Sequence, residues 1–134
     1  MTVDHPQGLA GHSDADVAVH ALMDALLGAA GLGDIGELFP DSDPAYAGAS
    51  SIALLELVVA RLSDAGWRIG NVDLTIVCER PRLARHRAEM RARLAAALGV
   101  EAEAVGVKAT TTEGMGFEGR GEGVAAHAVC LLER

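Results

Sequence analysis

A His-Ser-Asp tripeptide near the start of the chain is the first group whose type and spacing suggest chemistry. His12, Ser13 and Asp14 stand just before a run of apolar residues with helical spacing. Free backbone amides and the dipole at a helix start favour an anion, and the His12 and Ser13 side chains would add donors. The alternative is an ordinary N-cap made by Ser13 or Asp14, with a surface histidine. The tripeptide therefore predicts either an anion site or a cap.

His20 is a candidate metal ligand inside the same predicted helix. Asp16 precedes it by four residues and Asp24 follows it by four. Residues four apart share one helix face, so the imidazole and both carboxylates would lie together. Neutral imidazole commonly binds metals, and a carboxylate that accepts its second N–H fixes the tautomer. The competing interpretation is a half-buried histidine that only packs.

Two later segments carry groups suited to phosphates. Three threonines at 110–112 precede Glu113, after a predicted strand. Their hydroxyls suit phosphate oxygens, and Glu113 could hold a divalent cation, although threonines are also good strand residues. Phe117 and Arg120 stand in the glycine-rich run 114–123, which suits an anion site beside an apolar wall. This run opens no predicted helix, so it is not a dinucleotide-binding fingerprint.

The segment 34–43 is acidic and has turn chemistry. Its carboxylates, from Asp34, Asp41 and Asp43, could accept hydrogen bonds from sugar-like hydroxyls. They could equally form ordinary Asx turns. Both interpretations stay open from the residues alone.

Hydrophobic periodicity predicts the elements that must position these groups. Helices are expected at about 14–28, 51–62 and 81–98, strands at 72–78, 105–111 and 124–132, and a loop at 34–49. The helical segments repeat apolar residues every three or four positions, and the strands alternate them. The order helix, helix, strand, helix, strand, strand predicts an α+β fold, a small mixed β-sheet with helices packed on one face.

Composition limits the classes of protein. The 134 residues fit a single domain, and with 50% hydrophobic but only 3% aromatic residues the core is built from small aliphatic side chains. Such a core gains from oligomerisation. A net charge of −8 makes the chain a poor candidate for general nucleic-acid binding. The one basic stretch is expected to be a solvated helix face beside Glu89, formed by Arg82, Arg85, Arg87, Arg91 and Arg93.

The cysteine pattern and the lack of a targeting pattern in the N-terminal residues lead us to expect a reducing compartment. Cys78 and Cys130 lie in apolar strand-like runs without zinc-site spacing, so we expect buried thiols rather than a disulfide. The N-terminal residues have no apolar signal core or presequence pattern, and no apolar stretch is long enough to span a bilayer. We expect a cytoplasmic bacterial protein with neither nucleic-acid nor membrane partners.

Four stretches of sequence stand out in order and spacing. They read GLAGHSDADVAVHAL (8–22), LGDIGELFPDSDP (32–44), NVDLTI (71–76) and VKATTTEGMGFEGRGEG (107–123). Together they resemble the 2-C-methyl-D-erythritol 2,4-cyclodiphosphate synthase family, collinearly over nearly the whole chain.

The resemblance implies a homotrimer with active sites between neighbouring subunits, in the methylerythritol phosphate route to isoprenoids. The implied reaction converts 4-diphosphocytidyl-2-C-methyl-D-erythritol 2-phosphate into the cyclic diphosphate and CMP. The substrate's own 2-phosphate attacks the β-phosphorus of its cytidine diphosphate arm. The protein must bend the substrate, shield negative charge and stabilise the leaving CMP. The implied cofactors are zinc or a similar divalent transition metal, and Mg or Mn with the diphosphate.

The resemblance also implies roles for individual residues. His12 and Thr111 would stabilise the transition state. The phosphates would be contacted by His12, Ser13, Thr110, Thr111, Thr112 and Glu113. The methylerythritol part would be held by Asp34, Ile35, Gly36, Phe39, Pro40, Asp41, Ser42 and Asp43. The cytidine pocket would be lined by Cys78, Glu79, Arg80, Pro81, Arg82, Leu83 and Ala84. Phe117 and Arg120 would complete the site. His20 would bind zinc, and Glu113 a second divalent ion.

The chain departs from the family pattern in one respect. The family is expected to begin with a strand carrying Asp-x-His, whose side chains complete the zinc site. Nothing similar precedes His12, and Asp4-His5 has the wrong spacing. Catalytic zinc takes three protein ligands in its usual sites, so a lone imidazole is insufficient. We therefore expect one cyclodiphosphate synthase domain over 1–134, truncated at its N-terminus, with weak zinc binding.

Two other functions compete with the cyclising enzyme. One is a catalytically impaired relative that binds nucleotide or isoprenoid diphosphate without turnover. The other is a structural protein whose acidic loop only packs in an oligomer. The substrate loops favour the enzyme, because a chain released from catalysis has little physical need for His12, Asp34, Thr111 and Glu113 together.

Overall fold

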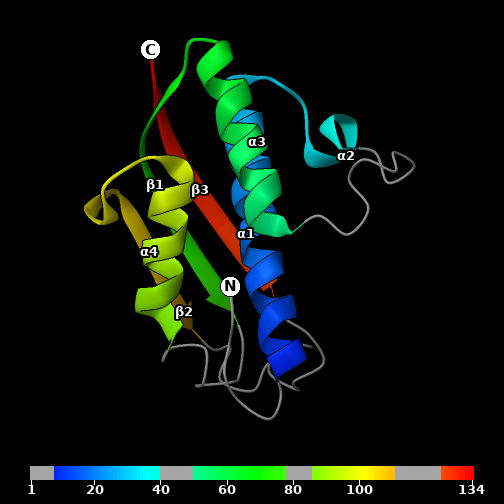
Figure 1. The fold of residues 1–134 in the computed structure, drawn as a ribbon, viewed down its shortest axis with the longest axis vertical. Coiled ribbons are helices and arrows are strands. Elements are labelled where there is room, and N and C mark those ends of the chain that lie inside the picture. Colours follow the sequence, from blue (N-terminus) through cyan, green and yellow to red (C-terminus); the bar gives the residue numbers. More distant parts are fainter. Residues whose placement is uncertain (1–7, 40–49, 78–85, 111–124) are drawn as a thin grey trace.

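The computed structural model describes residues 8–39, 50–77, 86–110 and 125–134, and for 8–15 the backbone alone. Its described strands form a mixed sheet in the order β2-β1-β3 (Figure 1). The central strand β1 (Arg68–Val77) runs parallel to β2 (Val105–Thr110) and antiparallel to β3 (Ala125–Glu133). Helices α1 (Gly8–Ala30) and α4 (Arg87–Leu98) pack on the sheet, and α3 (Ser51–Asp64) packs on both helices. The predicted α+β fold is confirmed.

Helix α1 owes its position to one apolar face. The buried side chains recur every three or four residues, at Ala18, Val19, Leu22, Met23, Leu26 and Leu27. Burying each of the larger ones stabilises the fold by roughly 1.5–3 kcal/mol. The helix ends where Gly31 adopts a φ of +71°, and the Leu32 N–H donates to the Leu27 carbonyl at 2.9 Å. This Schellman closure turns the chain sharply away from α1.

Helices α3 and α4 have defined limits. At the start of α3, the Ser50 hydroxyl caps the helix by accepting from the Ala53 N–H at 3.1 Å. Left-handed Gly66 and Gly99 follow α3 and α4, with φ of +89° and +72°. These stops deliver the chain directly into β1 and, through a 3-10 turn η3 (Ala102–Ala104), into β2.

The sheet has one covered and one uncovered face. Along β1, Val72, Leu74 and Ile76 are buried against the helices, and the residues between them point the other way. On that opposite face β3 exposes Val129 and Leu131, whose relative accessibilities are 69% and 57%. Within the described part of the chain, no helix covers this apolar patch.

Three sequence predictions about elements were wrong in their bounds. Helix α1 begins at Gly8 rather than near Asp14, and β1 begins at Arg68 rather than Val72. The segment expected to be wholly loop contains a short helix, α2 (Ile35–Leu38). The predicted start of the third helix at Pro81 lies outside the described residues.

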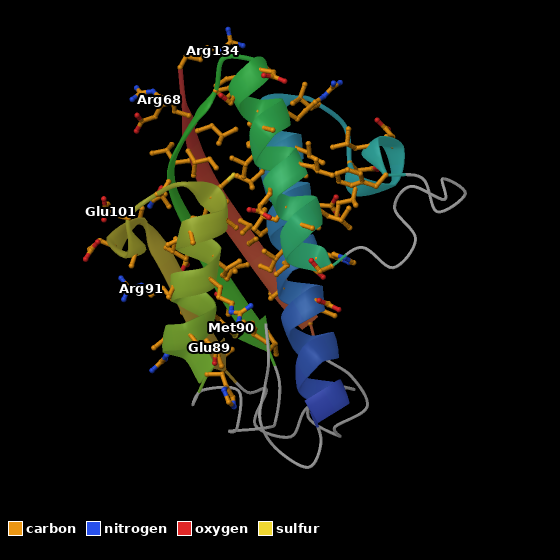
Figure 2. All side chains as sticks on the ribbon, in the orientation of Figure 1. Arg68, Glu89, Met90, Arg91, Glu101 and Arg134 are labelled. Atoms are coloured by element: carbon orange, nitrogen blue, oxygen red, sulfur yellow. The ribbon has the colours of Figure 1, made fainter. Side chains whose placement is uncertain are left out.

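The basic helix face was predicted correctly only in part. Arg93 lies 3.8 Å from Glu89, as expected for a solvated i,i+4 pair. Arg91 instead is half-buried, and its Nε donates to the carbonyls of Ala102 and Val105, each at 2.8 Å (Figure 2). This side chain therefore fastens the turn before β2 to α4 rather than facing solvent.

Cys130 is a free, half-buried thiol, and burial raises its pKa above the ordinary value. This agrees with the predicted buried thiol, while Cys78 lies outside the described residues. Among the described helices, none is long and apolar enough to cross a membrane.

Candidate active site

The ends of three strands meet at one edge of the sheet. Val77, the last residue of β1, pairs with Thr110, the last residue of β2. Val77 also pairs with Ala125, where β3 begins. The carboxyl ends of parallel strands are a common place for ligand sites. The predicted cytidine segment, 78–84, therefore follows Val77 directly, and the predicted phosphate segment, 110–113, begins at its partner Thr110.

The first half of α1 packs beside this edge. Ala18 is fully buried in a small cluster with Ile76 of β1 and Met90 of α4, which is labelled in Figure 2. His20 follows Ala18 by two residues and is exposed, so it faces away from the sheet. Among the described residues, no group of three or more His, Cys, Asp or Glu side chains is arranged to hold a metal ion. The described part of the chain thus does not assemble a zinc site around His20.

The aspartates that flank His20 contact the next segment of the chain. Asp24 Oδ1 accepts a hydrogen bond from the Ile35 N–H at 3.1 Å. Asp16 accepts a hydrogen bond from the Ser51 hydroxyl, at the start of α3. The sequence suggested that one of these carboxylates would orient the imidazole. The structure instead gives each of them a partner in the chain that follows α1.

The described part of the acidic segment, residues 34–39, contains a capped turn of helix. Asp34 Oδ1 accepts from the Glu37 N–H at 2.9 Å, which makes Asp34 the N-cap of α2. Its carboxylate is exposed, and a carboxylate has acceptor capacity beyond one bond. Phe39 is only 7% exposed and belongs to the main core cluster with α1 and α3. A substrate contact at Phe39 would therefore use its backbone rather than its ring.

The two groups of candidate residues lie on different sides of α1. The exposed face of the helix carries His20 and, through Asp24, the segment from Asp34 to Gly36. Its buried face packs against the sheet edge where Val77 and Thr110 end. Figure 1 shows α2 beside the C-terminal half of α1, well away from the end of β1. Among the described residues, one chain does not bring the two groups together.

The prediction that His12 and Ser13 lie at a helix start was wrong. Helix α1 begins at Gly8, so His12 and Ser13 are not among the first four residues, whose amides lack helical partners. Their backbone amides belong to the helix interior, and an anion there would depend on the side chains. The side chains of residues 8–15 lie outside the described part of the structure.

Comparison with known proteins decides the family. The YgbB family model matches residues 1–133. The bifunctional enzyme IspD/IspF of Anaeromyxobacter dehalogenans (strain 2CP-C) is 61% identical over 127 residues, 95% of this chain and 33% of that protein. The 2-C-methyl-D-erythritol 2,4-cyclodiphosphate synthase of Thiobacillus denitrificans (strain ATCC 25259 / T1) is 58% identical over 134 residues, 100% of this chain and 84% of that protein.

The chain belongs to the YgbB family. A solved 2C-methyl-D-erythritol-2,4-cyclodiphosphate synthase, in a form with bound CDP, has a TM-score of 0.79 and 36% identity to it. That similarity covers 87% of this chain and 75% of the other. This chain spans a third of the length of the bifunctional relative and most of the length of the single synthase. The family resemblance inferred from the four motifs is confirmed.

Many of the site residues predicted from the family pattern lie outside the described residues. These are Pro40, Asp41, Ser42, Asp43, Cys78, Glu79, Arg80, Pro81, Arg82, Leu83, Ala84, Thr111, Thr112, Glu113, Phe117 and Arg120. Those described are His20, Asp34, Ile35, Gly36, Phe39 and Thr110, together with the backbone of His12 and Ser13. They lie on α1, around α2 and at the end of β2.

Sequence reasoning missed a feature of this YgbB-family chain. The bonds from Asp24 to Ile35 and from Asp16 to Ser51 connect residues 11 and 35 positions apart. The only signal was the symmetric spacing of the two aspartates about His20, which was interpreted as orienting the imidazole.

A separate groove of about 760 Å³, lined by Asp73, Arg87 and Arg91 among others, lies at the start of β2, away from the ends of β1 and β2 at Val77 and Thr110.

Proposed function

We propose that this chain cyclises 4-diphosphocytidyl-2-C-methyl-D-erythritol 2-phosphate to 2-C-methyl-D-erythritol 2,4-cyclodiphosphate and releases CMP. The observation that carries the proposal is 58% identity over all 134 residues to a protein named for that synthesis. The CDP-bound relative adds support for a cytidine nucleotide as the ligand. The chain is proposed to act in isoprenoid precursor synthesis, as a phosphorus–oxygen lyase of the cytoplasm.

The reaction is an intramolecular phosphoryl transfer. An oxygen of the 2-phosphate forms a bond to the β-phosphorus, and the bond from that phosphorus to the oxygen bridging to CMP breaks. The electron pair of the broken bond leaves on CMP. Little covalent chemistry is required of the protein, so positioning and charge stabilisation must supply most of the rate. The His12 and Thr111 side chains are proposed to stabilise the charge that develops on the transferred group.

Positioning is divided between the two regions of the fold. The segment around Asp34 and α2 would hold the methylerythritol part, with the Asp34 carboxylate accepting from its hydroxyls. The segments that follow Val77 and Thr110 would hold the cytidine and its phosphates. Val77 and Thr110 themselves pair in register. A bent substrate can then be held at both ends while its two phosphates approach each other.

A metal ion belongs to the proposal, although the described residues do not supply its full ligand set. His20 is proposed as one ligand of zinc or a similar divalent transition metal. Glu113 is proposed to hold Mg or Mn at the diphosphate. A divalent ion at such a site would neutralise phosphate charge. The other zinc ligands must come from residues beyond those described.

We further propose that the chain assembles as a homotrimer with each site shared between neighbouring subunits. Two observations support this. The described residues of one chain leave the apolar side chains of Val129 and Leu131 exposed, and exposed apolar patches commonly mark interfaces. In addition, α1 separates the Asp34 region from the strand ends, so a complete site needs a second copy.

Complementation tests both proposals. Asp34→Ala and Thr111→Ala variants are each expected to lose CMP release. Mixing them under conditions that allow subunit exchange should restore part of the activity, because some shared sites then receive both native halves. A CMP-release assay on wild type, each variant and the mixture measures this. If the two inactive variants stay inactive after proven exchange, the shared site is wrong. If wild type with metal binds CDP but never releases CMP, the binding-only relative replaces the enzyme.

A further inference from the structure

The exposed face of α1 carries two hydrogen bonds, which join it to the first residues of α2 and α3. At one end Asp24 accepts from the Ile35 N–H at 3.1 Å. At the other Asp16 accepts from the Ser51 hydroxyl. The two aspartates are eight positions apart, which corresponds to ~12 Å of helix, with His20 midway. The same face that displays the candidate metal ligand thus also fixes where the acidic segment begins and where α3 starts.

The Asp24 bond fixes the part of the chain that carries Asp34. Asp34 caps α2 through the Glu37 N–H at 2.9 Å, but that bond is internal to its own turn. It shapes the turn without fixing its position relative to α1. Ile35, Leu38 and Phe39 pack against the core that contains α1. The Asp24–Ile35 bond adds a directional contact, because it joins the amide next to Asp34 to a carboxylate on that helix. The left-handed Gly31 and Gly33, with φ of +71° and +93°, allow the chain to reverse in the short distance available.

We propose that Asp24 and Asp16 are positioning residues. They hold the segment 34–36 and the start of α3 at a defined place relative to His20, and so set the distance between the substrate-binding carboxylate and the metal-ligating face. The kinetic consequence rests on the proposed function, whereas the bonds themselves do not. Neither aspartate touches the substrate in this proposal. Each acts through the residue that it holds.

Both bonds are exposed, and this separates positioning from general stability. Exposed hydrogen bonds contribute little to the free energy of unfolding compared with the buried apolar core. Losing one should leave the melting temperature within a few degrees of wild type. Geometry is more sensitive, because a misplaced substrate contact weakens every step that depends on it.

The first experiment measures amide hydrogen exchange at Ile35 by NMR. Asp24→Ala should speed this exchange about tenfold, the factor that corresponds to losing one hydrogen bond to a charged acceptor. Asp24→Asn keeps an amide oxygen as acceptor and should restore most of the protection. Glu56→Ala, which removes an exposed carboxylate on α3, is the matched control and should leave Ile35 exchange unchanged. This readout needs no catalytic activity.

The second experiment separates binding of the two substrate ends. In Asp24→Ala, KM for the full substrate should rise about tenfold while CDP affinity stays at the wild-type value. Asp16→Ala and Ser51→Ala should each raise KM, and the double variant should be no worse than either alone, because both remove one bond. Asp24→Asn should rescue KM as it rescues exchange.

Each outcome decides the proposal. Unchanged Ile35 exchange in Asp24→Ala overturns it, as does an Asp24→Asn variant that behaves like Asp24→Ala. Additive increases in KM from Asp16→Ala and Ser51→Ala overturn the positioning role of the Asp16–Ser51 hydrogen bond. A loss of metal affinity with unchanged exchange would place the Asp24 carboxylate on the His20 imidazole instead. A wild-type protein without CMP release would defeat the proposed function, while the exchange experiment still decides this inference.

Discussion

Replacing Leu131 by Asp should dissociate the proposed trimer. Leu131 is 57% exposed on the uncovered face of the sheet, and Val129 beside it is 69% exposed. Full burial of a leucine side chain contributes roughly 2 kcal/mol, so covering the exposed part of Leu131 contributes about 1 kcal/mol per subunit. Three subunits therefore lose about 3 kcal/mol, or roughly a hundredfold in the association constant. The buried carboxylate adds a desolvation cost to this loss.

Sedimentation velocity over a range of protein concentrations measures the effect. The matched control is Leu57→Asp, because Leu57 is also a half-exposed leucine, at 49%, but lies on α3 away from the sheet. The control should assemble like wild type, and Leu131→Asp should sediment as a folded monomer with reduced CMP release. Equal assembly of wild type and Leu131→Asp would refute the interface, and equal dissociation of both variants would show that the effect is not specific to this face.

Three further outcomes are expected. His20→Ala should abolish CMP release while leaving the sedimentation of the assembly unchanged, since the exposed imidazole contributes nothing to the core; normal turnover would remove His20 from the mechanism. CMP or CDP should bind measurably, and AMP much more weakly, in calorimetry; equal affinities would contradict the assigned cytidine segment. A zinc titration should give weaker binding for His20→Ala than for wild type; equal binding would contradict His20 as a zinc ligand.

Local patterning was enough to predict most elements of the fold. The repeat of apolar residues in α1 and the alternation at Val72, Leu74 and Ile76 follow directly from helix and strand geometry. The short helix α2 was missed because its composition is that of a turn. Its first amide is held by Asp24, eleven positions earlier, and such a contact is set by tertiary structure rather than by propensity.

The candidate site was predictable by motif but not by geometry. The motifs identified the family, whereas the pairing of Val77 with Thr110 depends on the strand order of the sheet. The start of α1 at Gly8 removed the free-amide argument for His12, because neither glycine nor alanine ahead of it prevents helix from extending backwards. The charged residues around Arg91 in the sequence predicted a solvent-exposed side chain. In the structure its Nε–H donates to the carbonyls of Ala102 and Val105.

The pairing of β3 has a consequence for synthesis on the ribosome. This strand is the farthest along the described chain, yet it pairs with central β1 and packs on α1. A nascent chain can form its helices early, since these need only local contacts. It cannot close the core over α1 until residues 125–133 have emerged from the exit tunnel. Until then the apolar face of α1 is accessible to chaperones, and translational pausing before residue 125 should lengthen that exposure.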